Sequence, residues 1–367
     1  MGKQFDRSSM SYYPLKQRAS KVDIVKSCVT EEQFQGTLNP EVRQRIAMIA
    51  EEILKARKKG ASVMCAFGAH TIKNGMGRLL GDFTRKGWFT HLATNGAGVI
   101  HDWEFAFQGK SSEDVRANVQ KGMFGTWEET GCYINLALAV GAYEGLGYGA
   151  SIGSLISGNG LAIPSKEELL TVISSDNEPL AKRAAAADLL DLLEQLEIEP
   201  GFLTIPHPFA SYSVQAIAFD AGVPFTSHPM FGHDIIYTHK ANKGAAIGRT
   251  AERDFLTYVQ SVYGLEGGVY LSVGSAVMSP MIFEKSLSMS RNVLRKQQRD
   301  IRDCGIHVVD LQEETWDWSQ GEPPADNPAY YLRFMKTFNR MGCRVDYTSA
   351  DNRAFLVELY RELKKRS

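Results

Sequence analysis

The sequence predicts an α/β fold: a Rossmann-like, doubly wound parallel sheet with helices on both faces. Two observations carry this prediction. Short apolar runs alternate with amphipathic runs along most of the chain, which is the order in which parallel strands and crossover helices follow one another. Glycine-rich turns come directly after two of the apolar runs, at residues 65–70 and 94–98, where sheets of this kind bind their ligands.

Composition narrows the class of protein. The chain has 367 residues, of which 44% are hydrophobic and 23% charged, as expected for a globular protein with a large core. Its net charge of −1 gives no reason to expect nucleic acid or a membrane as a partner. No apolar run reaches the roughly 18 residues of a membrane-spanning helix, and the polar N-terminus shows no secretory signal. We therefore expect a cytoplasmic protein whose five cysteines are reduced thiols.

The N-terminal half begins with a segment of mixed character. Residues 1–40 contain Pro14 and Pro40 and predict an N-terminal arm with little regular structure. No linker interrupts residues 41–367, which predicts a single large α/β nucleotide-binding domain. The glycine- and serine-rich segment 145–160 is expected to be a loop, and a capping box at residues 165–168 opens a helix. In this half we expect strands at 62–67 and 91–94, and further helices at 40–59, 72–86, 125–145 and 181–196.

The second half repeats the same alternation. We expect strands at 202–205, 223–226, 268–273, 306–311 and 344–347. The helices expected between and after them are 213–221, 251–263, 280–302, 327–341 and 352–365. Because the carboxyl ends of parallel strands meet at one edge of the sheet, residues that follow the strands are the candidates for ligand binding.

The glycine-rich turns have two interpretations. Backbone N–H groups that no side chain covers can hold a phosphate or pyrophosphate. Glycine is also needed wherever a strand-to-helix turn has a positive φ, whether or not a ligand binds. A third turn of small residues, 273–276, follows the strand expected at 268–273, so three such turns are placed at the ligand-binding edge.

Acidic and aromatic residues lie at the end of the strand expected at 306–311 and just after it. Asp310, Glu313 and Glu314 come first, with Trp316 and Trp318 close behind. A carboxylate at a strand end can hold ribose hydroxyls or an amine, and a tryptophan face adds favourable contact with a cation. The alternative is an exposed acidic loop whose tryptophans cover the core.

The segment 226–240 contains His228, His233 and His239. Their spacing fits no usual zinc motif, so we predict no metal site. General acid–base chemistry or substrate hydrogen bonding by one of these histidines fits the sequence better.

The order of these motifs resembles the deoxyhypusine synthase family over most of residues 60–360. That family has a Thr-Thr-Ala-Gly-Gly turn where this sequence reads Thr94-Asn95-Gly96-Ala97-Gly98, with Asp102 after it. Further matches to the family's glycine, acidic and aromatic motifs are the segments 232–240, 272–275, 312–313 and 350–351.

The resemblance implies an NAD-binding fold, a homotetramer and chemistry on an amine substrate. Carried over by position, it predicts that the dinucleotide is lined by Gly68, Ala69, Thr94, Asn95, Gly96, Gly274, Ser275, Asp310 and Asp351. It predicts that the amine faces Asp234, His239, Glu313, Trp316 and Asp317. His70 departs from the family's first turn and would add an imidazole to the pocket.

One departure from the family changes the predicted reaction. The family's imine-forming lysine lies in a Trp-Gly-Lys tripeptide, which this sequence lacks. Without it the family's covalent intermediate cannot form, so we predict an NAD-dependent enzyme that acts on an amine or related small metabolite. Two alternatives stay open. One is a hydrolase- or isomerase-type enzyme for another nucleotide or phosphorylated metabolite, with His70, His101 and His239 as acid–base groups. The other is a non-catalytic nucleotide-binding protein.

Overall fold

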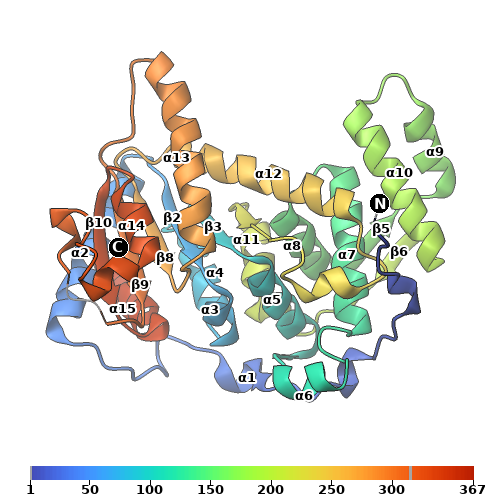
Figure 1. Ribbon diagram of the computed structural model, residues 1–367, viewed down its shortest axis with the longest axis horizontal. Helices are drawn as coiled ribbons and strands as arrows, with labels where there is room; N and C mark the ends of the chain where they lie inside the picture. Colours follow the sequence, from blue (N-terminus) through green and yellow to red (C-terminus); the bar gives the residue numbers. More distant parts are fainter. Residues whose placement is uncertain (1, 314–315) are drawn as a thin grey trace.

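The computed structural model, which describes residues 2–313 and 316–367, contains a six-stranded, fully parallel sheet (Figure 1). Its strand order is β10-β9-β8-β2-β3-β7. The chain thus builds the sheet outward from β2 in one direction and then from β8 in the other, which is the Rossmann order. The predicted fold class is confirmed. The strands are β2 (Val63–Phe67), β3 (His91–Thr94), β7 (Phe225–Ser227), β8 (Val269–Val273), β9 (Gly305–Asp310) and β10 (Arg344–Ser349).

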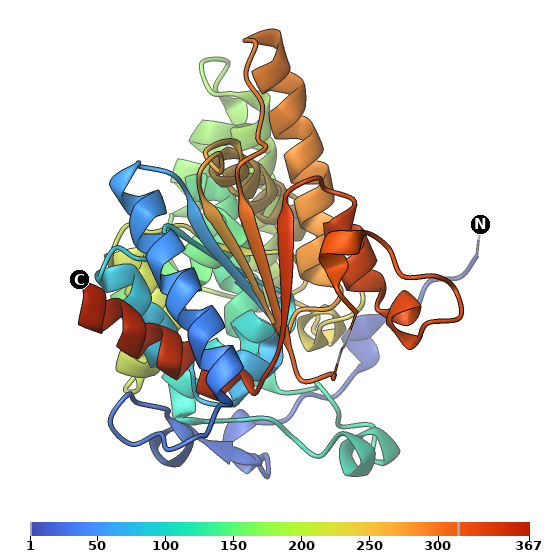
Figure 2. The ribbon, with the colours of Figure 1, turned by 90° about the vertical axis from the view of Figure 1, so that its left-hand side faces the viewer.

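Helices cover both faces of the sheet (Figure 2). Side chains alternate along β2, so that Val63, Cys65 and Phe67 belong to one buried cluster, and Met64 and Ala66 to the other. Because both faces are buried, the strands are apolar throughout, as parallel strands usually are. The first cluster includes α2 (Pro40–Lys58) and α15 (Asn352–Arg366), and the second includes parts of α12 (Gly244–Tyr263), α13 (Met278–Lys296) and α14 (Arg333–Asn339).

A long helical segment connects β3 to β7. Its helices α9 and α10 project from the body of the molecule (Figure 1). An antiparallel pair of strands, β5 (Gly160–Ile163) and β6 (Gly201–Thr204), lies within this segment, so the strand expected at 202–205 is outside the central sheet. The helices of this segment are α5 (Gly96–Gln108), α6 (Val115–Gln120), α7 (Glu128–Glu144), α8 (Tyr148–Gly158), α9 (Lys166–Ser174), α10 (Leu180–Leu196) and α11 (Val214–Asp220).

Two of these helices differ from the sequence prediction. No helix was expected at α5, where most residues are buried and the apolar side chains therefore show no clear helical period. The segment 145–160 was expected to be a loop, but α8 occupies most of it. Its glycines permit close packing there, since a Cβ on Gly149 would overlap the carbonyl oxygen of Phe225.

The helix expected at 72–86 is interrupted. It consists of α3 (Ala69–Lys73) and α4 (Gly77–Arg85), separated at Gly75, where φ is 81°. A Cβ on Gly75 would overlap the carbonyl oxygen of Ser27. The N-terminal segment therefore packs closely on this break, which a local helical pattern cannot reveal.

The N-terminal segment contains only short elements. They include β1 (Val22–Asp23), which pairs with β4 (Lys110–Ser111), and the single turn α1 (Ile24–Ser27). Arg18 from this segment forms a buried ion pair with Glu104 of α5. The division into an arm and one large domain stays a prediction.

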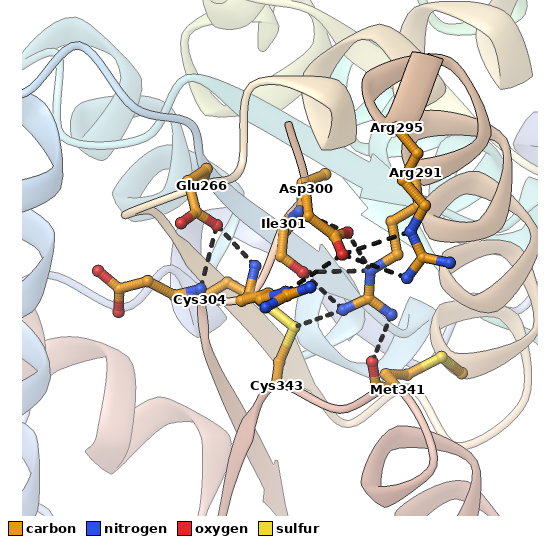
Figure 3. A network of polar contacts seen from close by, with 10 residues as sticks. Glu266, Arg291, Arg295, Asp300, Ile301, Cys304, Met341 and Cys343 are labelled. Carbon is orange, nitrogen blue, oxygen red and sulfur yellow. Dashed lines mark hydrogen bonds and ion pairs between the residues drawn. A yellow bond between two sulfur atoms is a disulfide. The ribbon is translucent and has the colours of Figure 1, made fainter. Parts of the chain in front are cut away.

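The structure contains a disulfide next to the first residues of two strands. The expectation of five reduced thiols is wrong for one pair, because Cys304 and Cys343 form a disulfide with a Cα–Cα distance of 5.5 Å. They directly precede β9 and β10, whose register places Gly305 opposite Arg344, and so brings together cysteines 39 residues apart. Arg291 donates to the carbonyls of Ile301 and Met341 beside this disulfide (Figure 3).

Within the described residues, no helix has the length and apolar character needed to cross a membrane.

Candidate functional site

The sheet reverses its strand order between β2 and β8, and the two glycine turns at this switch point touch. The N–H of Gly68 donates to the carbonyl oxygen of Val273 at 3.1 Å. A Cβ on Gly68 would overlap the carbonyl oxygen of Gly274, which itself has a φ of 58°. Both positions therefore require glycine, because other protein atoms fill the space where a side chain would begin. Open α/β sheets bind their ligands at this place.

All nine residues predicted to line a dinucleotide lie at this edge of the sheet. Thr94 and Asp310 are the last residues of β3 and β9, and the other seven follow β2, β3, β8 and β10. Some also have structural partners: the Thr94 hydroxyl donates to the Phe67 carbonyl, and the Asn95 side chain caps α5. Asp351 caps α15 and pairs with Arg353. Contact of these residues with a nucleotide stays a prediction.

Polar groups without partners lie near the switch point. The Asn352 amide nitrogen lies so close to Gly274 that a Cβ there would overlap it, and the Asn352 Oδ1 is buried without a hydrogen-bond partner. The Ser272 hydroxyl, on β8, is also buried and unpartnered. Asp310 Oδ1 accepts a hydrogen bond from the Leu311 N–H at 2.7 Å, which orients the carboxylate at the end of β9. Unpaired buried acceptors of this kind suit a ligand with hydroxyl or amide donors.

Asp234 occupies the β7 side of the same edge. It follows β7 and lies over the N-terminus of α5, where a Cβ on Gly96 would overlap its carboxylate. Burial raises the pKa of Asp234 to about 7, and its Oδ2 has no hydrogen-bond partner. The hydroxyls of Tyr148 and Tyr237 are likewise buried and unpartnered. Burial, and after it the charge of Asp234, raises the pKa of both phenols.

A cavity of about 230 Å³ extends from Asp234 along one side of α5. Its floor is a single helical face, because the α5 residues that line it are spaced three or four apart. Its walls come from the N-terminal segment, α3 and the loops around α6 and after β7. The residues that line it are Arg18, Lys73, Ala97, Ile100, His101, Glu104, Ser112, Glu113, Val115, Phe124, His233, Asp234 and Ile235.

Most charged groups in this cavity already have partners. Arg18 and Glu104 pair at 2.6 Å, with both side chains 1% exposed. Glu113 accepts hydrogen bonds from the Asn118 amide at 2.6 Å and the Trp127 indole at 3.0 Å. Burial lowers the pKa of His101 to about 4, so its ring is neutral at pH 7. Lys73 and Asp234 are therefore the charged groups most available to a ligand.

The structure places His239 away from this cavity. Its ring lies 4.3 Å from the Tyr12 ring, centroid to centroid, and its Nε2 lies 3.4 Å from a Glu128 carboxylate oxygen. Its Nδ1 accepts the Ala241 N–H at 3.1 Å. The Tyr12 contact attaches the N-terminal segment to the loop after β7. A catalytic role for His239 stays a prediction. His70 is exposed at the start of α3.

The other predicted amine-facing residues lie beyond β9. Glu313 and Asp317 are exposed, and the Trp316 indole donates to the Gly321 carbonyl. Four strand spacings separate β9 from β7, a distance of about 19 Å. The chain therefore does not bring them to Asp234. Glu314 lies outside the described residues.

The three clustered histidines do not converge either. His228 is buried, with its Nε2 3.0 Å from the Thr226 hydroxyl, whereas His233 is exposed. In the ranges 2–313 and 316–367, no three His, Cys, Asp or Glu side chains are grouped so that they could hold a metal ion.

Sequence reasoning missed several residues of the candidate site. Lys73 lies five positions after Gly68, in a helix that was expected to begin only at residue 72. Tyr148 falls in a segment expected to be a loop, and Arg18 lies in the arm. Asn352 directly follows the predicted Asp351. Only position in the sequence could have indicated any of them. Lys73 and Asn352 lie within a few residues of a predicted strand end, whereas Tyr148 and Arg18 do not.

No protein-family model matches the sequence, and no curated protein matches it either. Three solved structures are similar in fold. Unliganded AgrE has a TM-score of 0.45 and 14% identity over 91% of this chain and 34% of its own. ArgZ, an arginine dihydrolase from the ornithine–ammonia cycle in Cyanobacteria, has a TM-score of 0.45 and 15% identity, over 90% of this chain and 34% of its own. A conserved putative LOR/SDH protein from Methanococcus maripaludis S2 has a TM-score of 0.44 and 12% identity, over 90% of this chain and 72% of its own.

These structures overturn the resemblance stated from the sequence. AgrE, ArgZ and the LOR/SDH protein are not deoxyhypusine synthases, so the assignment to that family is wrong. The physical reason is that glycine turns and acidic strand ends recur in many doubly wound sheets, so their order does not separate one family from another. The chain spans about a third of the length of AgrE and ArgZ. The homo-oligomer expected from the resemblance stays a prediction.

Proposed function

We propose that this protein is an NAD-dependent enzyme that acts on a small metabolite bearing an amine. The observation that carries the proposal is the position of Asp234. Asp234 is half-buried, and its Oδ2 is buried without a hydrogen-bond partner over the N-terminus of α5. It lines a cavity of metabolite size and follows β7, at the same edge of the sheet as the switch point.

The residues at the switch point fit a dinucleotide. The turns at Gly68 and Gly274 would lie beneath it, and Asn352 Oδ1 offers an acceptor that no protein group uses. Asp310, at the end of β9, would hold ribose hydroxyls. We assign the nicotinamide half to the β3–β7 side, because Asp234 and the cavity lie there. When bound, NAD+ supplies a hydride acceptor for the carbon that carries the amine.

Asp234 would hold the substrate's ammonium group and accept a proton from its nitrogen. A carboxyl group with a pKa of about 7 is ionised in a large fraction of molecules at neutral pH and is an effective base there. Tyr148 and Tyr237 keep their protons, because their pKa values are raised, and so act as hydrogen-bond donors to Asp234 or to substrate. Their burial also keeps water from the reacting carbon.

Calorimetric titration with NAD+ tests the proposal, followed by measurement of NADH absorbance with a panel of amines. We expect saturable NAD+ binding, weakened about tenfold by Asn352→Ala through loss of one hydrogen bond. Asn292→Ala is the matched control, because that asparagine is exposed on α13 and remote from the edge. Absence of binding at millimolar NAD+ removes the proposal. Thermal stabilisation by sugar phosphates or other nucleotides, without NAD+ binding, would favour a hydrolase- or isomerase-type enzyme instead.

A further inference from the structure

The cavity beside α5 carries opposite charges on its walls, at two positions along the helix. Asp234 lies at the first residue of α5, over Gly96. Lys73, the last residue of α3, lies near His101, since after burial its charge is among the causes that lower the pKa of His101. Gly96 and His101 are five residues apart in one helix, which corresponds to about 7.5 Å along its axis.

Lys73 is the cation in this cavity that lacks an anionic partner. The other buried cation, Arg18, is neutralised by Glu104 at 2.6 Å. Lys73 is half-buried and makes no hydrogen bond or ion pair within the part of the chain that the structure describes. A partly desolvated ammonium that faces a cavity favours an anionic ligand group, because a charge-assisted hydrogen bond offsets its lost hydration.

We propose that the substrate is a small amino acid whose amine and carboxylate are separated by several bonds. This inference rests on the proposed function and names its substrate class. Asp234 binds the amine and Lys73 binds the carboxylate, so that the aliphatic chain between them lies on Ala97 and Ile100. A cavity of about 230 Å³ suits one metabolite of this size.

Three five-carbon compounds test the proposal by calorimetry on the full chain, with and without saturating NAD+. They are 5-aminopentanoate, 1-aminopentane and pentanoate, which differ only in their charged ends. We expect 5-aminopentanoate to bind at least tenfold more tightly than either of the others. Equal affinity of 5-aminopentanoate and 1-aminopentane, or no binding of 5-aminopentanoate, overturns the proposal.

Substitution of Lys73 supplies the second readout. Lys73→Gln should weaken 5-aminopentanoate binding at least tenfold and leave 1-aminopentane binding unchanged, whereas Lys73→Arg should retain most of the affinity. Lys86→Gln is the matched control, because Lys86 is an exposed lysine at the end of α4. A Lys73→Gln variant that weakens both ligands equally contradicts the carboxylate contact.

The two proposals can fail separately. If NAD+ binds and amines are oxidised without any effect of Lys73, the proposed function stands and the substrate class is wrong. If 5-aminopentanoate binds through Lys73 but NAD+ does not bind, the amino acid site stands and the NAD-dependent reaction is wrong.

Discussion

Arg18 of the N-terminal segment and Glu104 of α5 form a bidentate ion pair that is almost completely shielded from solvent. The two hydrogen bonds measure 2.7 and 2.6 Å, and Glu104 also accepts hydrogen bonds from Ser111 and Thr130. The pair joins segments 86 residues apart in the sequence and forms one wall of the cavity.

Removal of Arg18 should destabilise the fold strongly. Arg18→Ala leaves a buried carboxylate without its cation, and we expect a loss of about 3–5 kcal/mol in the free energy of unfolding. Urea denaturation measures it. Arg18→Met combined with Glu104→Gln should recover most of the loss, because no buried charge is left. Arg85→Ala, which breaks an exposed pair with Asp82, should cost less than about 1 kcal/mol. Similar costs for the two single variants would contradict the prediction.

Gly96→Ala should move Asp234. The new methyl group would overlap the Asp234 carboxylate, which must then turn away from the N-terminus of α5. We expect at least a tenfold loss of any amine-oxidising activity, measured by NADH absorbance. The matched control is Gly248→Ala in α12, where the methyl group meets no atom within 4 Å. In the Asp234→Ala background, Gly96→Ala should lose its effect on stability, because the clash is gone. If the losses in the free energy of unfolding of the two single variants simply add in the double variant, the two residues do not interact.

Asp234 should make stability depend on pH in a defined direction. Its pKa of about 7 in the folded chain exceeds the unfolded value of roughly 3.9. The folded state therefore binds more protons between these values, and stability falls as the pH rises from about 4 to 7. Relative to Asp234→Asn, wild type should lose up to roughly 4 kcal/mol over this range.

The difference in stability between wild type and Asp234→Asn reports on the Asp234 carboxyl group alone. Asp254 also has a pKa raised to about 7 by burial, but both proteins keep it, so its contribution cancels in the difference. Denaturant titrations at several pH values give the curve. A difference that stays constant between pH 4 and 7 would show that Asp234 is not shifted.

The Cys304–Cys343 disulfide should contribute measurably to stability. The loop-entropy account for a separation of 39 residues gives about 4 kcal/mol. Dithiothreitol should therefore lower the unfolding midpoint of wild type and leave Cys304→Ser/Cys343→Ser unchanged. Thiol titration of the denatured, non-reduced protein should find only Cys28, Cys65 and Cys132. Detection of all five thiols under those conditions would contradict the disulfide.

Local sequence patterns determined the class of fold and the edge at which a ligand would bind. Continuous apolar runs such as 63–67 and 269–273 follow from burial on both faces of a parallel sheet, and the glycines after them follow from the close contact between Gly68 and Gly274. Each feature is a run of only a few residues, so the sequence displays it directly, although the contact that requires the glycines joins distant segments.

The tertiary structure alone decided which polar side chains meet. Asp234, Lys73 and Tyr148 come from three distant segments, and α5 and α8 were not predicted, because helices buried on most sides lose the amphipathic period. The family resemblance grouped Glu313 and Asp317 with Asp234, yet they lie about four strand spacings away from it. The order of strands in a sheet is set by long-range packing of helices on its two faces, so a local sequence pattern cannot predict it.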